Sequence, residues 1–278
     1  MTTNPDTRIH LLALDVDGTL LTSDQTISEA TRAAIQAVTA RGIRVVLASA
    51  RSPYTLRPIM AQLDIEGYAI AFSGGMLCRL SRDPARPIEI LSERSLPVSS
   101  AQTIVRLALA RGISVGWFMG EAWHIQAWDE TLRREAANIG MPLIASAPLA
   151  LMTDAPHKIQ CMVAGPDRAV DLHRLRADLP PDCIGHFTHE TYLEIFPHGV
   201  DKATGLQQLG HQLGIELHEM AAVGDGENDV TMLQTVGLGI AMGHAPASVR
   251  QAAAWTTSSN DEDGVALAIE RIRREGRV

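Results

Sequence analysis

Two carboxylates, Asp15 and Asp17, stand one residue apart directly after the apolar run Ile9–Leu14. Residues i and i+2 of an extended strand project to the same side, so both acids can converge on one ligand at the end of that strand. Two carboxylates this close repel each other unless a cation or a shared proton lies between them. Gly18 leaves the backbone free to turn toward that point. The spacing therefore suggests a metal site with a reactive aspartate.

Two other interpretations apply to this segment. Asp and Gly after a strand are ordinary turn residues, so the segment alone carries little information. A calcium loop of the EF-hand type that began at Asp15 would need glycine at its sixth position, where the chain has Leu20. The choice between a turn and a site depends on the rest of the chain.

Small, hydroxyl and acidic residues also follow three more apolar runs, at 44–48, 68–72 and 220–223. The residues that follow are Ser49-Ala50-Arg51, Ser73-Gly74-Gly75 and Gly224-Asp225-Gly226-Glu227-Asn228-Asp229. Ligands of open α/β sheets bind at the carboxyl ends of the strands, and we expect these residues to form one site.

Phosphoryl transfer explains this set of residue types. The reaction needs a positioned nucleophile, a divalent cation and donors around the phosphoryl group. Asp15 would attack phosphorus to form an aspartyl phosphate, and Asp17 would protonate the leaving oxygen and then deprotonate the attacking water. Magnesium prefers octahedral oxygen coordination with one or two carboxylates, which Asp15 and Asp225 would supply.

The remaining candidates would contact the phosphoryl group or the substrate. Ser49 would donate its hydroxyl and Ala50 its backbone N–H, near the start of the next helix. Arg51, after the run 44–48, and Gly74, after the run 68–72, are further candidates for substrate contacts. Lys202 would offset the negative charge.

Lysine is rare in this chain, since only Lys158 and Lys202 occur among 24 basic residues. Lysine supplies a compact point charge where arginine supplies a planar fork. Each of the two lysines is therefore a candidate for a position that needs that shape. Drift is the alternative explanation, and it stays open for Lys158.

Composition limits the partners and the location. The formal net charge is −8 and the basic residues form no long run, which argues against nucleic acid. Met1–Arg8 lacks an apolar signal core, and no stretch approaches the ~20 continuous apolar residues of a membrane span. We expect a cytoplasmic monomer or weak homo-oligomer that acts on a small-molecule phosphate ester, with no membrane partner. Cys78, Cys161 and Cys183 are expected to be buried free thiols.

The pattern of elements predicts an α/β fold. Short apolar runs alternate with helix-period segments, as in β-α-β units around a doubly wound, mostly parallel sheet of the Rossmann-like kind. The expected core strands are 9–14, 44–48, 68–72, 220–223 and 238–241, and the expected helices are 28–40, 53–63, 202–213, 228–235 and 246–253.

The middle of the chain predicts a separate α+β module. With 278 residues and 46% hydrophobic composition, the chain has room for two domains. We expect a catalytic core of residues 1–84 and 192–278 and an inserted, substrate-selecting cap of residues 85–191. Its expected strand pairs are 114–118 with 123–127 and 159–164 with 192–196, and its expected helices are 99–111, 130–139 and 167–178.

Four motifs in order resemble the haloacid dehalogenase superfamily: D-V-D-G-T, A-S-A-R, G-V-D-K and G-D-G-E-N-D. Three longer segments are similar to its Cof-like phosphatases, namely L-E-I-F-P-H-G-V-D-K-A-T-G-L, I-A-M-G-H-A and S-N-D-E-D-G-V-A. The resemblance covers the whole core and implies a magnesium-dependent phosphatase with a large α/β cap.

The resemblance also implies roles for individual residues. It implies Asp15 as nucleophile and Asp17 as acid and base, with the backbone carbonyl of Asp17 on magnesium. Ser49 and Lys202 would hold the phosphoryl group. The other implied roles are metal binding by Asp225, support of the metal by Asp229 and phosphate contact by Asn228.

Three positions depart from the pattern of the family. Ala50 stands where the family usually has glycine, and a backbone donor survives that change. Ser73 and His244 each stand where the family usually has asparagine. Neither position belongs to the core catalytic set, so the departures concern substrate contacts.

The expected activity is hydrolysis of small phosphorylated metabolites, either sugar phosphates or cofactor phosphates. A phosphomutase or phosphotransferase that uses the same aspartyl phosphate is the alternative. A non-catalytic receiver domain shares the paired acids but needs neither a cap nor a leaving-group acid such as Asp17. A P-loop nucleotidase is excluded because the chain contains no G-x-x-x-x-G-K.

Overall fold

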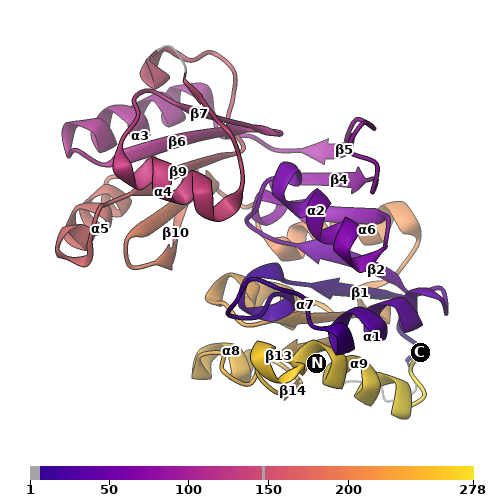
Figure 1. Ribbon diagram of the computed structural model, residues 1–278. Helices are drawn as coiled ribbons and strands as arrows, with labels where there is room; N and C mark the ends of the chain where they lie inside the picture. Colours follow the sequence, from indigo (N-terminus) through magenta and orange to yellow (C-terminus); the bar gives the residue numbers. More distant parts are fainter. Residues whose placement is uncertain (1–6, 146–147) are drawn as a thin grey trace. The chain divides into compact units, whose positions relative to one another are not determined.

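The computed structural model describes residues 7–145 and 148–278, which divide into two compact units (Figure 1). The first unit comprises the described part of Met1–Arg51 together with Leu56–Leu91 and Asp201–Val278. The second comprises Ser52–Thr55 and Ser92–Val200. Each unit has its own sheet.

The unit boundaries differ from the expected limits of 85 and 191. Strand β5 (Glu89–Glu93) lies at the edge of the first sheet, beside β4 (Met76–Leu80), so the first unit continues past residue 84. Strand β11 (Tyr192–Pro197) pairs with β9 (Lys158–Met162) and β10 (Cys183–His189) in the second sheet. The chain therefore returns to the first unit only after β11.

The sheet of the first unit has the order β14-β13-β12-β1-β2-β3-β4-β5. Its central strands are parallel, and only β4 runs antiparallel to β3 among the pairs with a described register. All four residues of β1 are apolar and buried, as expected for a parallel strand covered on both faces. The other strands are β2 (Arg44–Ala48), β3 (Gly67–Ala71), β12 (Met220–Gly224), β13 (Leu238–Ala241) and β14 (Trp255–Thr256), with β1 at Leu11–Leu14.

Helices cover both faces of this sheet. The connection β1-α1-β2 moves along the sheet in one direction, and β12-α7-β13 moves in the other. Because such crossovers are right-handed, α1 and α7 lie on opposite faces. Helix α9 packs on α1, whereas α6 packs on α7. The helices are α1 (Glu29–Thr39), α2 (Pro53–Leu63), α6 (Lys202–Leu213), α7 (Val230–Thr235), α8 (Ala247–Ala252) and α9 (Gly264–Arg274).

The second unit is an antiparallel sheet with helices, in the order β10-β11-β9-β6-β7-β8. Strands β6 (Ser114–Met119) and β7 (Ala122–Ile125) form the expected hairpin, and β8 (Leu143–Ala145) adds a parallel edge. One sheet face packs against α3 (Val98–Ala110) and α5 (Ala169–Ala177) through a single apolar cluster. Helix α4 (Glu130–Ile139) contacts β6.

The predicted α/β fold with an inserted α+β module is confirmed. All three cysteines are buried thiols that form no disulfide, as expected. Among the described residues, no helix combines the length and the apolar character needed to cross a bilayer.

Candidate active site

The candidate site lies at the carboxyl end of the central strand β1. The chain stays paired with β12 for one residue beyond β1, because the amide of Asp15 donates to the carbonyl of Val223 at 3.0 Å. Residues Leu14, Leu47 and Val223 lie in register on neighbouring strands, so the segments after β1, β2 and β12 emerge together. From β1 the chain continues to β2 on one side, whereas from β12 it continues to β13 on the other side. Open α/β sheets bind ligands at such a point, where the strand order reverses.

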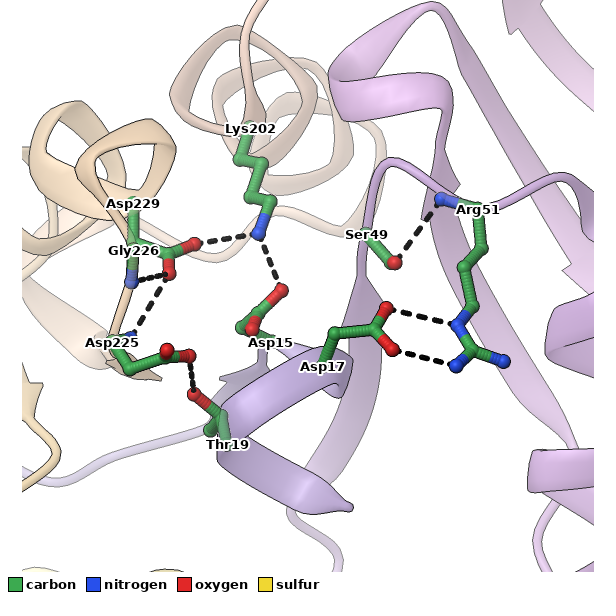
Figure 2. Close-up of polar contacts among 9 residues, drawn as sticks. All are labelled: Asp15, Asp17, Thr19, Ser49, Arg51, Lys202, Asp225, Gly226 and Asp229. Carbon is green, nitrogen blue, oxygen red and sulfur yellow. Dashed lines mark hydrogen bonds and ion pairs between the residues drawn. The ribbon is translucent and has the colours of Figure 1, made fainter. Parts of the chain in front are cut away.

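The segment after β1 turns within one short helical stretch, Val16–Leu20, with Gly18 at a φ of 78°. This turn gives the two predicted carboxylates different partners, and Figure 2 shows Asp15 pointing to Lys202 and Asp17 pointing to Arg51. The carboxylates thus do not share one cation, although the strand spacing suggested that they converge. Asp15 is buried, whereas the side chain of Asp17 is 52% exposed.

Lys202 is fully buried and joins two carboxylates. Its Nζ lies 2.5 Å from Asp15 Oδ1 and 2.6 Å from Asp229 Oδ1. It is the first residue of α6, where the Asp201 side chain accepts from the amide of Thr204 and fixes the start of the helix. Burial lowers the pKa of Lys202, but the two carboxylates outweigh it and raise the pKa above its usual value. The scarcity of lysine predicted that Lys202 stands at a position that needs a compact charge. The structure places its ammonium between two carboxylates.

Asp229 organises the loop after β12. It is fully buried, and its Oδ2 accepts from the amides of Asp225 (3.0 Å) and Gly226 (2.9 Å). Since Oδ1 accepts from Lys202, both oxygens of Asp229 are already used. Asp225 is held from the other side, because the hydroxyl of Thr19 donates to its Oδ1 at 2.7 Å. Thr19 was not singled out from the sequence, although it is the last residue of D-V-D-G-T.

Three carboxylates crowd together here. One oxygen each of Asp15, Asp225 and Asp229 lies within 4.8 Å of the others. Burial raises the pKa of Asp15 well above its usual range, and the charges of Asp229 and Asp225 raise it further, against the lowering effect of Lys202. Burial also raises the pKa of Asp225, with the charge of Asp229 adding to it. One ammonium cannot neutralise three acids, so a divalent cation fits this donor set.

The geometry indicates which residues would hold such a cation. Asp15 and Asp225 would contribute carboxylate oxygens, while Asp229 would fix the loop behind them. The carboxylate of Asp17 is bound to Arg51, so Asp17 is left with its backbone carbonyl, the ligand that the family resemblance implies.

Magnesium should stabilise the protein more at neutral than at acidic pH. Because the pKa values of Asp15 and Asp225 are higher in the folded than in the unfolded protein, stability without metal falls as pH rises from about 4, the unfolded value, through the raised values. Bound cation removes this penalty but competes with protons. At fixed magnesium concentration, the increase in Tm should be larger at about pH 8 than at about pH 5.

Thermal denaturation with magnesium or with a chelator measures this difference. Asp225→Asn serves as the control and should lose most of the magnesium-dependent increase in Tm. An increase of the same size at both pH values would contradict the assignment of the cation to these acids.

The predicted phosphate donors lie after β2. Ser49 is buried, its carbonyl accepts from Ser73 N at 2.8 Å, and its hydroxyl oxygen accepts from Arg51 N at 3.1 Å. These bonds fix the loop and leave the Ser49 hydroxyl proton for another acceptor. Ala50 is half-buried beside it. Asn228 is half-buried in the short helical turn that precedes α7.

Gly74 has a packing reason to be glycine. Its φ is 107°, and an added Cβ would collide with the backbone carbonyl of Asp201. The loop after β3 therefore passes directly over Asp201, the residue that precedes α6. This close approach supports the position of Lys202 and accounts for Gly74 without a substrate contact.

Arg51 binds Asp17 rather than lying open toward a substrate. Its Nε donates to Asp17 Oδ2 at 2.9 Å and its Nη2 donates to Asp17 Oδ1 at 2.6 Å, a bidentate pair (Figure 2). The same Nη2 donates to Gln25 Oε1 at 3.0 Å. The contacts of Arg51 with Asp17 and with Gln25 cannot be read from the sequence motifs, because each contact joins residues of two different loops. His244, one of the departures, lies 3.7 Å from Asp225 Oδ2.

Comparison with known proteins agrees with this architecture. The family model of haloacid dehalogenase-like hydrolases matches residues 12–269. A Haemophilus influenzae protein named "Putative phosphatase" is 32% identical over 257 residues, which are 92% of this chain and 95% of that protein. An "HMP-PP phosphatase" of Yersinia pseudotuberculosis is 27% identical over 87% of this chain and 86% of its own length.

A solved structure is similar as well. The haloacid dehalogenase-like hydrolase from Bacteroides thetaiotaomicron superposes with a TM-score of 0.85 and 30% identity, over 95% of this chain and all of that one. The order of the motifs, the fold and these matches agree. The chain belongs to the haloacid dehalogenase-like hydrolases, in their branch of Cof-like phosphatases.

Proposed function

We propose that the protein is a magnesium-dependent phosphatase that hydrolyses small phosphorylated metabolites through an aspartyl phosphate on Asp15. The observation that carries the proposal is the position of Asp15, which lies at the end of β1 with Lys202 on one oxygen and Asp225 nearby. A carboxylate held by a buried ammonium in a cluster of acids is oriented for attack, and a purely structural strand end would not need it.

Asp15 acts as the nucleophile in the first displacement. The contact of Lys202 with Oδ1 leaves Oδ2 to attack phosphorus, with the bond to the leaving oxygen breaking on the opposite side. Lys202 lowers the pKa of Asp15 and so opposes the larger, raising effect of burial. Magnesium, when bound, would neutralise charge on the phosphoryl oxygens and draw them toward the acids.

Asp17 moves the protons. It protonates the leaving oxygen in the first displacement and takes a proton from the attacking water in the second. Its exposed carboxylate is open to exchange protons with water, in contrast to the buried Asp15. The hydroxyl of Ser49, the amide of Ala50 and the side chain of Asn228 would donate to the phosphoryl oxygens.

The second unit is proposed to select the substrate, as the inserted cap that the sequence predicts. Sugar phosphates and cofactor phosphates are the proposed substrate class, and the similarity to a protein named "HMP-PP phosphatase" supports a phosphatase activity.

Release of phosphate from a panel of phosphorylated metabolites tests the proposal. Turnover should require magnesium and stop when a chelator is added. Asp225→Asn should lower kcat/KM by roughly 10²–10³-fold at a fixed magnesium concentration, because electrostatic stabilisation of the transferring group is lost.

Two outcomes would contradict the proposal. Turnover that survives complete removal of divalent metal would refute the dependence on magnesium. Transfer of the phosphoryl group to a second sugar, with little free phosphate, would replace hydrolysis by a mutase reaction.

A further inference from the structure

A tight loop follows the turn that carries Asp17. The amide of Thr22 donates to the carbonyl of Thr26, and the amide of Gln25 donates to the carbonyl of Thr22, both at 2.9 Å. Three residues, Ser23, Asp24 and Gln25, thus connect the two ends. Three-residue loops of this kind end in a residue with left-handed backbone.

Gln25 occupies that left-handed position, with a φ of 57°. Glycine suits this conformation best, because a Cβ is strained there. Seven residues earlier, the chain places a glycine, Gly18, at such a left-handed position. Backbone strain of this kind is kept where the side chain has a task, and glutamine has no short polar group to stabilise its own backbone locally.

The side chain of Gln25 reaches the guanidinium of Arg51. Its Oε1 accepts from Nη2 at 3.0 Å, and this nitrogen is the one that binds Asp17 Oδ1. Arginine carries five N–H donors in a fixed planar fork, so an acceptor on one edge of the fork helps to fix how the fork faces Asp17. Gln25 thus acts on Asp17 through Arg51.

The loop is anchored from the other end of the chain. The amide and the hydroxyl of Ser23 donate to the Asp261 carboxylate at 2.8 and 2.6 Å. The side chain of Asn260 donates to the carbonyl of Leu21 at 2.8 Å. The acceptor Asp261 and the donor Asn260 both belong to the segment S-N-D-E-D-G-V-A. The loop can therefore hold Gln25 in place although the side chain is exposed.

We propose that Gln25 is a positioning residue that holds Arg51, and through it Asp17, for the removal of the proton from water in the second displacement. This inference rests on the proposed function. The bidentate pair fixes where the Asp17 carboxylate lies, and each of its oxygens keeps a further lone pair that can accept a proton from water. Loss of the Gln25 amide should therefore slow hydrolysis of the aspartyl phosphate more than its formation.

The substitution Gln25→Gly separates this role from a structural one. It relieves the backbone strain, so Tm should rise by about 1–3 °C. With p-nitrophenyl phosphate, whose leaving group needs no proton, kcat should fall roughly 3- to 10-fold. KM should fall by the same factor, and a burst of nitrophenol should appear, because kcat/KM reports only the first displacement.

Two variants complete the experiment. Gln25→Glu keeps an acceptor for Arg51 and should restore kcat, whereas Asp24→Ala, on the same exposed loop, should leave kcat and KM unchanged. A Gln25→Gly enzyme with wild-type kcat, or with kcat/KM lowered as much as kcat and no burst, would overturn the role of Gln25. Failure of the wild-type protein to release nitrophenol would instead refute the proposed phosphatase activity.

Discussion

Replacing Asp15 by asparagine should lower kcat/KM for every phosphate ester by at least about 10⁴-fold, because the amide cannot attack phosphorus and the covalent route is lost. The same change should not destabilise the fold. Burial and the neighbouring acids hold the pKa of Asp15 well above its usual range, so removing its charge relieves repulsion. Tm of the metal-free protein should stay equal or rise, as measured by thermal denaturation beside an assay of phosphate release.

Asp24→Asn is the matched control, since it makes the same chemical change at an exposed position in the neighbouring loop. Its kcat/KM should equal that of the wild-type protein. Substantial turnover by Asp15→Asn, after proof that the asparagine has not deamidated, would refute Asp15 as nucleophile.

Replacing Lys202 by methionine should impair both turnover and folding. Methionine has similar length but no charge, so Asp15 and Asp229 would face each other without the ammonium that now lies within 2.6 Å of both. We expect kcat/KM to fall roughly 10²–10³-fold. The free energy of unfolding without metal should fall by about 3 kcal/mol, as when one partner of a buried ion pair is removed.

A double variant and a second lysine make this prediction specific. In the Asp15→Asn background, Lys202→Met should destabilise the protein less, because fewer buried charges are left without a partner. Lys158→Met removes the other lysine, which is also buried and lies 2.6 Å from Glu194 in the second unit. It should destabilise as well but keep turnover of p-nitrophenyl phosphate within a few fold. Equal losses of kcat/KM in both lysine variants would contradict the special role of Lys202.

The core elements were predictable because parallel strands and their helices have strong local signatures. Strands β1, β2 and β12 are short apolar runs, and the residues that end them are polar. Since parallel strands bring their carboxyl ends to one edge, the sequence predicts that Asp15 and Asp225 lie close together, and the structure has them so.

Several elements were not predicted from the sequence: the strands β4, β5, β8, β10 and β14 and the helix α9. Strands β5, β8 and β14 are short edge strands with several exposed residues. The cap was expected to end at residue 191, although the strand 192–196 was expected to pair with 159–164 of the same module. The structure has that pairing with β9 and adds β10 on the other side of β11, so the second unit extends through β11.

The partners of the site residues were not predictable from the motifs. The strand spacing predicts that the carboxylates of Asp15 and Asp17 converge. In the structure, the helical turn after β1 gives them different partners, Lys202 and Arg51. The contact of Arg51 with Asp17 and the left-handed Gln25 depend on how two loops meet. A motif identifies residue types, whereas the hydrogen bonds between loops are set by the folded chain.

Direct detection of the phosphorylated enzyme tests the central claim. The Asp17→Asn variant should form the aspartyl phosphate from p-nitrophenyl phosphate but hydrolyse it slowly, since the base for water is missing. After acid quenching, peptide mass spectrometry should find one added phosphoryl group, and it should lie on Asp15. Absence of the phosphoryl group during measurable turnover, or its presence on another residue, would contradict a mechanism through Asp15.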